Sequence, residues 1–508
     1  MFGNKKQEAD VTAVDSGSDH NDPLANTGKS QWQRIWPVLV CGGGLFSDGY
    51  INNVIGSVST ILSRIYGDQY TKSSALQNVS SIAFAGTVVG QLIFGYTSDK
   101  WSRKNSLLVS TVLLALFAGL AASSYGYKGS TSGMFQALVA WRFLVGIGIG
   151  GEYPAGSVAA SEATGELKSG RRHRWFILAT NCAIDVGFVT GAFVPYLVVV
   201  ATTEKHLRAA WRIMLGLGVV CPIILLFART KLKEPEEFKK ESMKYVKIPY
   251  KHVIAFYWPR LLVVSAIWFM YDFSTYSFGI YSSSILANIF DSTTSPLSTA
   301  LGWNVIINLF YLPGAIFGSF LSDWVGPKYA LTIGVELQAI FGFIMASAYN
   351  TFAEPKNVGA FVVIYGLFLS LGEVGPGDNI GLLASKTCAT GVRGQYYGIA
   401  ASVGKIGAFV GTWVFPELEK INGGSAAAKL QYPFYLSSAM CVFTGLIAFF
   451  FLPNVGQDTI TTEDIRFRAY LESRGWDTNQ LGMIKGESIE SRAVIHQDNR
   501  DNASDEKL

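Results

Sequence analysis

The sequence predicts an all-α integral membrane protein in which twelve transmembrane helices form two pseudo-symmetric halves of six. Three observations predict this fold class. The chain has 508 residues, of which 49% are hydrophobic and only 15% are charged, whereas roughly a quarter of the residues in a soluble domain are charged. Apolar stretches recur from end to end, each long enough to cross a bilayer. Acidic residues within these stretches repeat at a fixed spacing along the chain.

The apolar stretches give the expected order of the spans. We expect them near residues 36–58, 77–97, 106–125, 136–160, 175–200, 210–229, 260–285, 299–321, 329–349, 358–383, 395–416 and 433–452. The expected organisation is a disordered cytoplasmic tail (1–30), an N-terminal six-helix half (31–229), a cytoplasmic linker (230–258), a C-terminal six-helix half (259–453) and a cytoplasmic C-terminal tail (454–508). Within that last tail, TEDIRFRAYLES could form an amphipathic helix on the membrane surface or against the bundle.

Two pairs of aspartates share one sequence offset. Asp48 and Asp272 lie in apolar stretches and are 272 − 48 = 224 residues apart. Asp99 and Asp323 follow apolar stretches and are 323 − 99 = 224 residues apart. A basic turn recurs at nearly the same spacing. Matching features in corresponding spans and loops indicate duplicated halves related by an axis along the membrane normal.

Basic residues are distributed unevenly between the loops. Lys and Arg gather after spans 2, 4 and 6, at residues 100–104, 168–174 and 231–251, whereas the loops after spans 3, 7 and 9 hold a single Lys or none. Cytoplasmic loops of membrane proteins carry an excess of Lys and Arg. Both termini are therefore expected in the cytoplasm.

Several acidic residues fall inside the expected spans, where a charge at the bilayer centre costs roughly 2.5–3.5 kcal/mol on insertion scales. They are Asp48, Glu152, Asp185, Asp272, Glu336, Glu373 and Asp378. Such residues line a water-filled path or bind a partner. A carboxylate that exchanges a cationic partner for a proton can couple the protein to a proton gradient. Arg142 is the expected partner of Asp48.

Two further features predict a polar binding surface. Trp268, Asp272 and Tyr276 stand at i, i+4 and i+8 and share one face of the seventh span. A polar contact between helices is the alternative interpretation. Lys405 is the sole charge in the Gly/Ala-rich stretch IAASVGKIGAFVG, so it needs a carboxylate or an anionic ligand. We expect it to anchor a phosphate group, and an ion pair with Asp185 (405 − 185 = 220) is the competing interpretation.

Span 4 carries glycines at helical spacing. Gly146, Gly150 and Gly151 allow close approach of a neighbouring helix. Pro154 frees backbone hydrogen bonds beside Glu152. Packing alone is the competing interpretation, but a carboxylate placed between the glycines and the proline favours a functional segment.

No enzyme signature is visible in the sequence. GxSxG, a Walker loop, HExxH and Cys/His metal spacing are all absent. The run GIGIGG lies inside a span rather than after a strand, so it does not indicate a dinucleotide site. We expect a protein that is not an enzyme, with no catalytic residues, no metal, no cofactor and no nucleic-acid partner.

At this point the motifs resemble those of a known family. Gly95-x-x-x-Asp99-Lys100-x-x-Arg103-Lys104 and Arg142-x-x-x-Gly146-x-x-x-Gly150 resemble the loop 2–3 and span 4 motifs of the major facilitator superfamily. More narrowly, LFSDGY, GIGIGGEYP, W-x-x-x-D-x-x-x-Y and SVGKIGA resemble its phosphate:proton symporter branch. The resemblance covers about residues 36–452 and implies the major facilitator fold, with a central site between the halves.

The resemblance also implies roles for individual residues. Positions matching Tyr153, Trp268, Asp272, Tyr276 and Lys405 contact phosphate in that branch, and Asp272 would also gain or lose a proton. Positions matching Asp48 and Glu152 are implicated in proton transfer, with Arg142 as the partner of Asp48. Gly95, Asp99 and Arg103, together with an Asp323–Lys328 pair, are expected to form the inner gate.

The sequence departs from the phosphate carriers at three positions. Asp185 replaces a Gln in span 5, Asp378 of GPGDN replaces a Thr-rich stretch in span 10, and Ser110 replaces a carboxylate in span 3. Added carboxylates repel doubly charged phosphate but suit a phosphodiester, which carries one negative charge. We therefore expect Asp185 and Asp378 to bind substrate as well. This pattern is similar to the fungal glycerophosphodiester permeases for glycerophosphoinositol and glycerophosphocholine.

The sequence predicts the head group of the diester substrate less directly. Asp185 or Asp378 could accept inositol hydroxyls, whereas aromatic residues could face a choline head. The aromatic candidates are Tyr276, Tyr281, Trp303 and Tyr311.

The sequence therefore predicts a monomeric, multi-pass, proton-coupled symporter of the plasma membrane that imports glycerophosphodiesters by alternating access. Its partners are the small phosphodiester substrate, protons and the lipid bilayer. Three alternatives stay open. An inorganic phosphate symporter would be inhibited by free phosphate, a non-transporting nutrient sensor would bind without flux, and a sugar or polyol carrier would need neither Lys405 nor a pH gradient.

Overall fold

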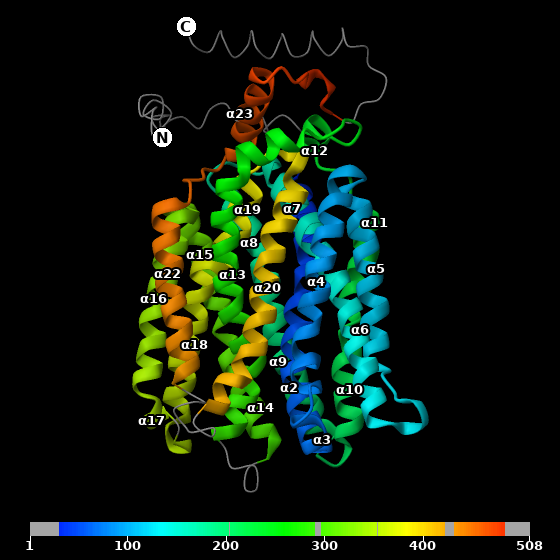
Figure 1. Cartoon of the computed structure of the whole chain (residues 1–508), viewed down its shortest axis with the longest axis vertical. Coiled ribbons are helices and arrows are strands. Elements are labelled where there is room, and N and C mark those ends of the chain that lie inside the picture. The colour runs from blue at the N-terminus through cyan, green and yellow to red at the C-terminus, as the bar shows by residue number, and fades with distance from the viewer. Residues whose placement is uncertain (1–29, 203, 290–295, 353, 422–430, 483–508) are drawn as a thin grey trace.

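The computed structural model describes residues 30–202, 204–289, 296–352, 354–421 and 431–482. This part of the chain is a bundle of long helices without strands (Figure 1). Up to residue 241 the helices are α1 (Gln31–Gly42), α2 (Phe46–Tyr66), α3 (Asp68–Thr71), α4 (Ala75–Lys100), α5 (Arg103–Ala122), α6 (Thr131–Gly151), η4 (Glu152–Ser157), α7 (Val158–Ala163), α8 (Arg172–Ala179), α9 (Asn181–Thr202), α10 (Leu207–Leu217), α11 (Val220–Thr230) and α12 (Glu236–Glu241).

The second part of the chain repeats this arrangement. Its helices are α13 (Tyr250–Ile289), α14 (Leu297–Leu309), α15 (Tyr311–Trp324), α16 (Pro327–Ser347), α17 (Tyr349–Phe352), α18 (Val358–Gly372), η8 (Glu373–Gly377), α19 (Asp378–Lys386), α20 (Arg393–Lys420), α22 (Tyr432–Phe451) and α23 (Thr459–Ser473). Several expected spans are pairs of helices that continue one another across a local break, such as α14 and α15.

Eleven helical segments within the described residues are long and apolar enough to cross a membrane. The expected first span, α1–α2, is not among them because α2 buries polar side chains, including Asp48, Asn52 and Asn53. It still packs inside the bundle, where a Cβ added to Gly49 would lie 1.9 Å from the carbonyl oxygen of Ile184 on α9. The all-helical membrane fold class is therefore confirmed.

The two halves share an unusual break in helix geometry. A π-helical segment, η4, begins at Glu152 and contains Pro154, and a second, η8, begins at Glu373 and contains Pro376. The two acidic residues are 373 − 152 = 221 residues apart, close to the offset found from the sequence. Proline removes a backbone donor and clashes with the preceding turn, so each segment widens locally. In both halves the widened turn carries a buried carboxylate.

The glycines predicted to allow close packing do so. A Cβ on Gly146 would lie 2.0 Å from the carbonyl oxygen of Ala83 on α4, and one on Gly150 would lie 2.5 Å from that of Thr87. Gly151 packs in the same way against Ser110 of α5. Helix α6 therefore contacts α4 backbone to backbone, which holds Glu152 at a fixed position.

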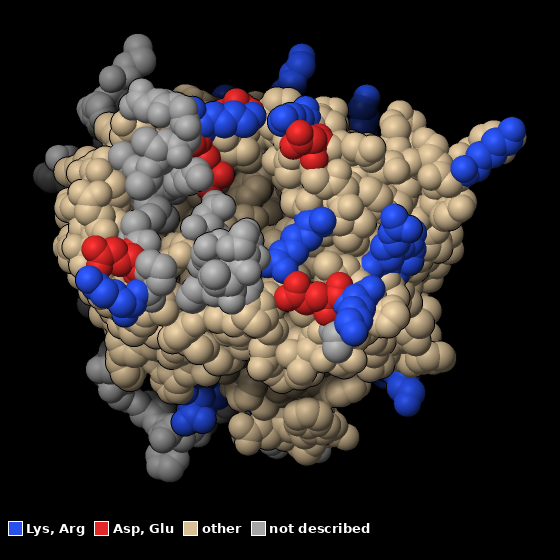
Figure 2. Space-filling model, turned by 90° about the horizontal axis from the view of Figure 1, so that it is seen from below, with Lys and Arg blue, Asp and Glu red and all other residues tan. Residues whose placement is uncertain are grey.

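The described chain begins and ends at one end of the bundle, where α12 and α23 lie across the helix ends (Figure 1). We call this the α23 end. The amphipathic helix expected within 454–508 is α23, and it packs against the bundle, with Glu463 2.7 Å from Arg260 of α13. The opposite end is mostly uncharged, with scattered residues of both signs (Figure 2). The tail at 1–29 and the chain after 482 lie outside the described residues.

The two halves touch near both ends of the bundle. Toward the α23 end, a Cβ on Gly95 of α4 would lie 2.9 Å from the carbonyl oxygen of Gly394 on α20. Toward the opposite end, a Cβ on Gly56 of α2 would lie 2.0 Å from that of Ile280 on α13. The space between the halves is therefore bordered by helix contacts on both sides.

Candidate functional site

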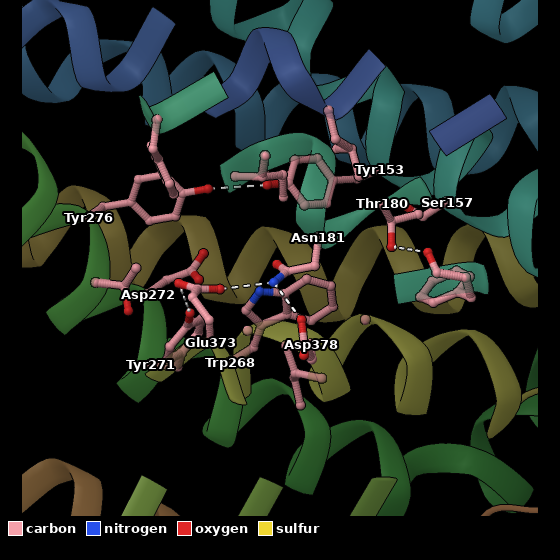
Figure 3. Close-up of a pocket in the computed structure, with 18 of the residues that line it drawn as sticks. Tyr153, Ser157, Thr180, Asn181, Trp268, Tyr271, Asp272, Tyr276, Glu373 and Asp378 are labelled. Atoms are coloured by element: carbon pink, nitrogen blue, oxygen red, sulfur yellow. Dashed lines mark hydrogen bonds between the residues drawn. The ribbon is translucent and has the colours of Figure 1, made fainter. Parts of the chain in front are cut away.

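A central cavity of about 50 Å³ lies between the halves. Figure 3 shows polar side chains from both halves pointing toward one another around it. Its polar lining consists of Tyr153, Ser157, Thr180, Asn181, Trp268, Tyr271, Asp272, Thr275, Tyr276, Glu373, Asp378 and Tyr397. One water needs about 10–15 Å³ of such volume. A larger solute therefore requires the lining side chains to separate and exchange their present partners for the solute.

Lys405 on α20 is 1% exposed and contacts the lining residues Asp272 and Tyr276, although it does not itself line the cavity. Its ammonium lies 3.3 Å from the carboxylate of Asp272 and 3.5 Å from that of Asp48. It also donates a hydrogen bond to the hydroxyl of Tyr276. The ammonium stands 3.8 Å from the ring centre of Tyr276 and 4.8 Å from that of Tyr153. Two carboxylates and two aromatic rings therefore neutralise this buried charge.

Asp48 connects the lysine to the N-terminal half. Its Oδ2 atom accepts hydrogen bonds from the hydroxyls of Tyr153 and, at 2.7 Å, Tyr276. Its Oδ1 atom accepts one from the amide of Asn52 at 2.5 Å. One ammonium faces two carboxylates, so the cluster has one negative charge in excess when both carboxylates are ionised. Such a cluster can take up a proton and then release its ammonium to another anion.

Close helix packing fixes the position of the lysine. A Cβ on Gly404 would lie 2.5 Å from the indole of Trp268, and one on Gly407 would lie 2.2 Å from the carbonyl oxygen of Phe269. Helix α20 therefore presses Lys405 against α13. All three residues of the stripe predicted on α13 line the cavity, as expected from their spacing.

A second polar cluster fills the cavity wall nearest α19. The amide of Asn181 donates hydrogen bonds to Glu373 at 2.9 Å and to Asp378 at 2.8 Å, and contacts Asp185 at 3.4 Å. The hydroxyl of Tyr271 donates to the other oxygen of Glu373 at 2.8 Å. We call Asp185, Glu373 and Asp378 the acidic cluster. Asp185 and Asp378 are the carboxylates that the sequence adds relative to the phosphate carriers. They thus belong to one group, in which Glu373 is the third member.

The ion pair considered between Lys405 and Asp185 is wrong. Asp185 lies on α9, which packs against α2 and α14, whereas α20 packs against α13 and α4. Corresponding positions in the two halves are related by the pseudo-symmetry axis and need not touch. Within the described residues, the Oδ1 atom of Asp185 has no hydrogen-bond partner.

Two residues of the N-terminal half have partners that the sequence did not predict. Glu152 forms a buried ion pair with Arg229 of α11, with both of its oxygens 2.6 Å from the guanidinium. Arg142 does not pair with Asp48, and instead donates to the carbonyl oxygen of Ile51 at 3.4 Å. Asp48 instead contacts Tyr153, Tyr276 and Lys405.

The residues Asp99 and Arg103, predicted for the inner gate, lie together at the α23 end and have more partners than expected. Asp99 lies 2.5 Å from Arg103 and accepts the backbone N–H of Gly394 at 2.9 Å. Glu162 lies 3.0 Å from Arg103 and also 3.0 Å from Arg393 of the other half. One carboxylate therefore joins an arginine from each half, and the whole group is buried.

The second gate pair has a different basic partner. Asp323 lies 3.1 Å from Arg174, which belongs to the other half, and accepts a hydrogen bond from Gln457 at 3.0 Å. Lys328 lies beside the ring of Tyr329 and forms no ion pair within the described chain. The expected Asp323–Lys328 pair is therefore wrong. Contact between the halves brings Arg174 closer than the basic residue that follows Asp323 in sequence.

Three aromatic residues proposed to face a choline head lie away from the cavity lining. The hydroxyl of Tyr281 donates to the carbonyl oxygen of Thr412 at 2.9 Å. Tyr311 packs on Phe188, with 5.0 Å between ring centres. Trp303 lines a separate pocket of about 410 Å³ with residues of α9 and α14. Only Tyr276 of the four candidates reaches the central site.

Sequence reasoning missed several residues of the site and its supports. Asn181, Tyr271 and Arg229 carried no charge pattern or motif that set them apart. Glu373 was noted as an intramembrane carboxylate, and comparing GEVGPG with GEYPAG would have placed it opposite Glu152. Glu162 lies near the end of the long helical segment that contains Glu152. It could have been predicted as an ion-pair partner of the basic turns.

Comparison with known proteins agrees with this architecture. Residues 41–412 match the family model described as Major Facilitator Superfamily. A glycerophosphocholine permease of Candida albicans is 50% identical over 458 residues, covering 89% of this chain and 85% of the permease. A major glycerophosphoinositol permease of the same organism is 47% identical over 486 residues, covering 94% and 89%. The solved proton:xylose symporter XylE has a TM-score of 0.69 at 19% identity, covering 85% of this chain and 98% of the symporter. The chain therefore belongs to the Major Facilitator Superfamily, in the family of transport proteins that includes these glycerophosphodiester permeases.

Proposed function

We propose that this protein is a symporter that imports glycerophosphodiesters together with protons across the plasma membrane. The observation that carries the proposal is Lys405, a buried ammonium beside the central cavity whose carboxylate partners come from both halves. A phosphodiester needs a cation, and coupling needs a carboxylate that can change charge. Lys405 supplies the cation. Asp48 and Asp272, whose carboxylates lie within 3.5 Å of it, supply the groups that can change charge.

Binding begins with an exchange of partners. Protonation of Asp48 or Asp272 weakens its hold on Lys405, and the phosphodiester oxygens take the vacated place. The hydroxyls of Tyr153 and Tyr276, which now donate to Asp48, can donate to the phosphodiester instead. Proton and substrate therefore favour each other's binding, because each stabilises the arrangement that the other needs.

Translocation requires the two halves to rock about this site. With the cytoplasmic orientation predicted from the basic loops, the α23 end is the inner gate. The bridge from Glu162 to Arg103 and Arg393, and the pair of Arg174 with Asp323, must break for substrate to leave. Glu152 would relay protons only after separating from Arg229, so it acts later than Asp48.

The substrate class is supported by the relatives and by the site. The most similar relatives named above carry names for glycerophosphocholine and glycerophosphoinositol permeases. Asp185 and Asp378 add buried carboxyl groups near the cavity, and ionisation of either would disfavour doubly charged phosphate relative to a singly charged diester.

The test is uptake of labelled glycerophosphocholine, glycerophosphoinositol and phosphate into cells without their own carriers, at pH 5 and pH 7.5. We expect diester uptake that is stronger at acid pH and abolished by a protonophore. Uptake of phosphate alone would show that the substrate is inorganic phosphate rather than a glycerophosphodiester. Binding without flux would make the protein a sensor. Flux that changes neither with pH nor on the loss of Lys405 would show that the protein is a facilitative polyol carrier.

A further inference from the structure

We infer that the acidic cluster and the aromatic rings beside it form a head-group subsite that takes a cation, such as the quaternary ammonium of choline. This inference rests on the proposed diester transport and names the part of the substrate that the second cluster recognises. The residues concerned are Asp185, Glu373 and Asp378, with Asn181, Tyr271 and Trp268 around them.

The cluster has more acceptors than donors. One side-chain amide, that of Asn181, faces all three carboxyl groups, and an amide nitrogen carries only two protons. The Oδ1 atom of Asp185, which does not line the cavity, and the Oδ2 atom of Asp378, which lies 2.1 Å from the position of a Cβ on Gly318 of α15, have no hydrogen-bond partner within the described chain. Both residues and Glu373 are at most 2% exposed. Buried acceptors left in this way mark a place where a positive ligand is favoured.

No basic side chain of the described residues compensates these charges. The ion pairs of the described Lys and Arg residues lie elsewhere, as for Arg229, Arg393 and Lys405, and none reaches Asp185, Glu373 or Asp378. Lys405 is held by Asp48 and Asp272. Three carboxyl groups buried together without a counter-charge cannot all stay ionised, so a cation that arrives stabilises the ionised form and binds favourably.

The two clusters are placed to receive the two ends of one zwitterion. Asp272 and Tyr271 are consecutive on α13. Asp272 contacts Lys405, and Tyr271 donates to Glu373. The phosphodiester end would therefore lie toward Asp272 and Lys405 and the cationic end toward Glu373 and Asp378. Asp272, Glu373 and Asp378 line one cavity (Figure 3).

Aromatic side chains complete the cationic side. Trp268, Tyr271, Phe176 and Phe188 line the same cavity as Glu373. Aromatic faces attract quaternary ammonium groups, which cannot donate hydrogen bonds and so rely on carboxylate charge and on π-systems. Inositol, in contrast, would need donors as well as acceptors, and this wall offers mostly acceptors.

The first test compares substrates in three variants, Asp185→Asn, Glu373→Gln and Asp378→Asn, which keep the size and remove the charge. The readout is the ratio of uptake efficiencies for glycerophosphocholine and glycerophosphoinositol. We expect this ratio to fall about tenfold or more in at least Glu373→Gln and Asp378→Asn, as for loss of a desolvated cation contact. Glu336→Gln is the matched control, because Glu336 packs against Gly445 of α22 away from the cavity.

An unchanged ratio, or a selective loss of glycerophosphoinositol uptake, would overturn the inference and make the cluster a hydroxyl acceptor or a site for protons alone. A wild-type protein that carries glycerophosphoinositol but not glycerophosphocholine would overturn it while leaving the proposed function intact. A wild-type protein that carries no diester would overturn the proposed function itself.

A second test needs no variant. The purified wild-type protein is heated with glycerophosphocholine or with its carbon isostere, in which a 3,3-dimethylbutyl group replaces choline and the head group has no positive charge. We expect glycerophosphocholine to raise the Tm and the isostere, which keeps the phosphodiester but lacks the quaternary ammonium, to bind about tenfold more weakly. Equal binding of the two would overturn the inference.

Discussion

The ammonium of Lys405 lies 3.5 Å from the carboxylate of Asp48, across the seam between the two halves. The two residues come from α20 and α2, 357 positions apart in the chain. This contact connects the anion-binding group of one half to an acid of the other. Any movement that separates the halves must change it, so it is the natural point at which substrate, proton and conformation act on one another.

Replacing Lys405 by Ala should abolish diester uptake, with a loss of about a hundredfold or more, because the phosphodiester loses its charge-assisted partner. Labelled uptake, normalised to surface expression, measures it. Lys328→Ala is the matched control, since Lys328 lies beside the ring of Tyr329 and forms no ion pair within the described chain. Normal uptake by the Lys405 variant would refute the role of this lysine.

Asp48→Asn should uncouple transport from the proton gradient. An amide keeps the hydrogen bonds with Tyr153 and Tyr276 possible but cannot gain or lose a proton at working pH. We expect net accumulation at acid pH to fall about tenfold or more, while exchange of internal for external substrate continues. Counterflow from preloaded vesicles separates the two activities.

The control for that variant is Glu336→Gln, another intramembrane acid, which should leave both activities unchanged. Loss of exchange and accumulation in equal measure would assign Asp48 to substrate binding rather than to coupling.

Glu152→Gln should destabilise the protein by about 3–5 kcal/mol, because it leaves the buried guanidinium of Arg229 without its carboxylate. Thermal unfolding in detergent and the yield of folded protein measure the effect. Glu152→Gln combined with Arg229→Met should recover much of the stability, since both charges are then removed. A single variant as stable as the wild type would show that the pair is dispensable for folding.

A disulfide across the inner gate should lock the protein. The hydroxyls of Ser161 and Ser385, one from each half, are 2.9 Å apart and buried. Ser161→Cys with Ser385→Cys should therefore form a bridge on mild oxidation. We expect oxidation to stop uptake almost completely and a reductant to restore it. Each single cysteine variant should be insensitive to oxidation, and uptake that survives a formed bridge would mean that this face does not open.

Docking of α23 should depend on pH through Asp464. Its carboxylate accepts the backbone N–H and the hydroxyl of Thr390, both at 2.6 Å, and it faces Arg393 and Glu241. Burial raises the pKa of Asp464 from 3.8 to about 6, against the opposing effects of Arg393 and Thr390. A raised carboxyl pKa means that docking takes up a proton. Docking is strongest below pH 3.8 and weakens as the pH rises through about 6.

Between pH 5 and pH 7 the docking constant should fall about tenfold. Hydrogen exchange of residues 459–473, corrected for intrinsic rates, measures it. Asp464→Asn should remove the pH dependence, because an amide does not titrate in this range. An identical slope in the variant would trace the effect to another group.

Much of the fold could be predicted from the sequence. Long apolar stretches specify transmembrane helices because backbone groups must be satisfied inside the bilayer, and the repeat of Asp48 and Asp272 indicated two related halves. Helical spacing placed Trp268, Asp272 and Tyr276 on one face. The first span was recognised from its length and position although its polar residues lower its hydropathy.

Partners could not be predicted in the same way. An ion pair between Lys405 and Asp185 was considered because of their sequence offset. The offset relates equivalent positions of the two halves and does not predict contact. Arg174 replaced Lys328 as the partner of Asp323 for the same reason.

The sequence by itself determined the helices, their grouping into halves and the buried acids and lysine between them, because these follow from local hydropathy and periodicity. Only the tertiary structure decided that Lys405 faces Asp48 and Asp272 and that Glu373 joins Asp185 and Asp378. Those pairings depend on how each helix is rotated and how closely it approaches its neighbours. Glycine contacts and the two π-helical segments set that rotation, through packing between residues hundreds of positions apart.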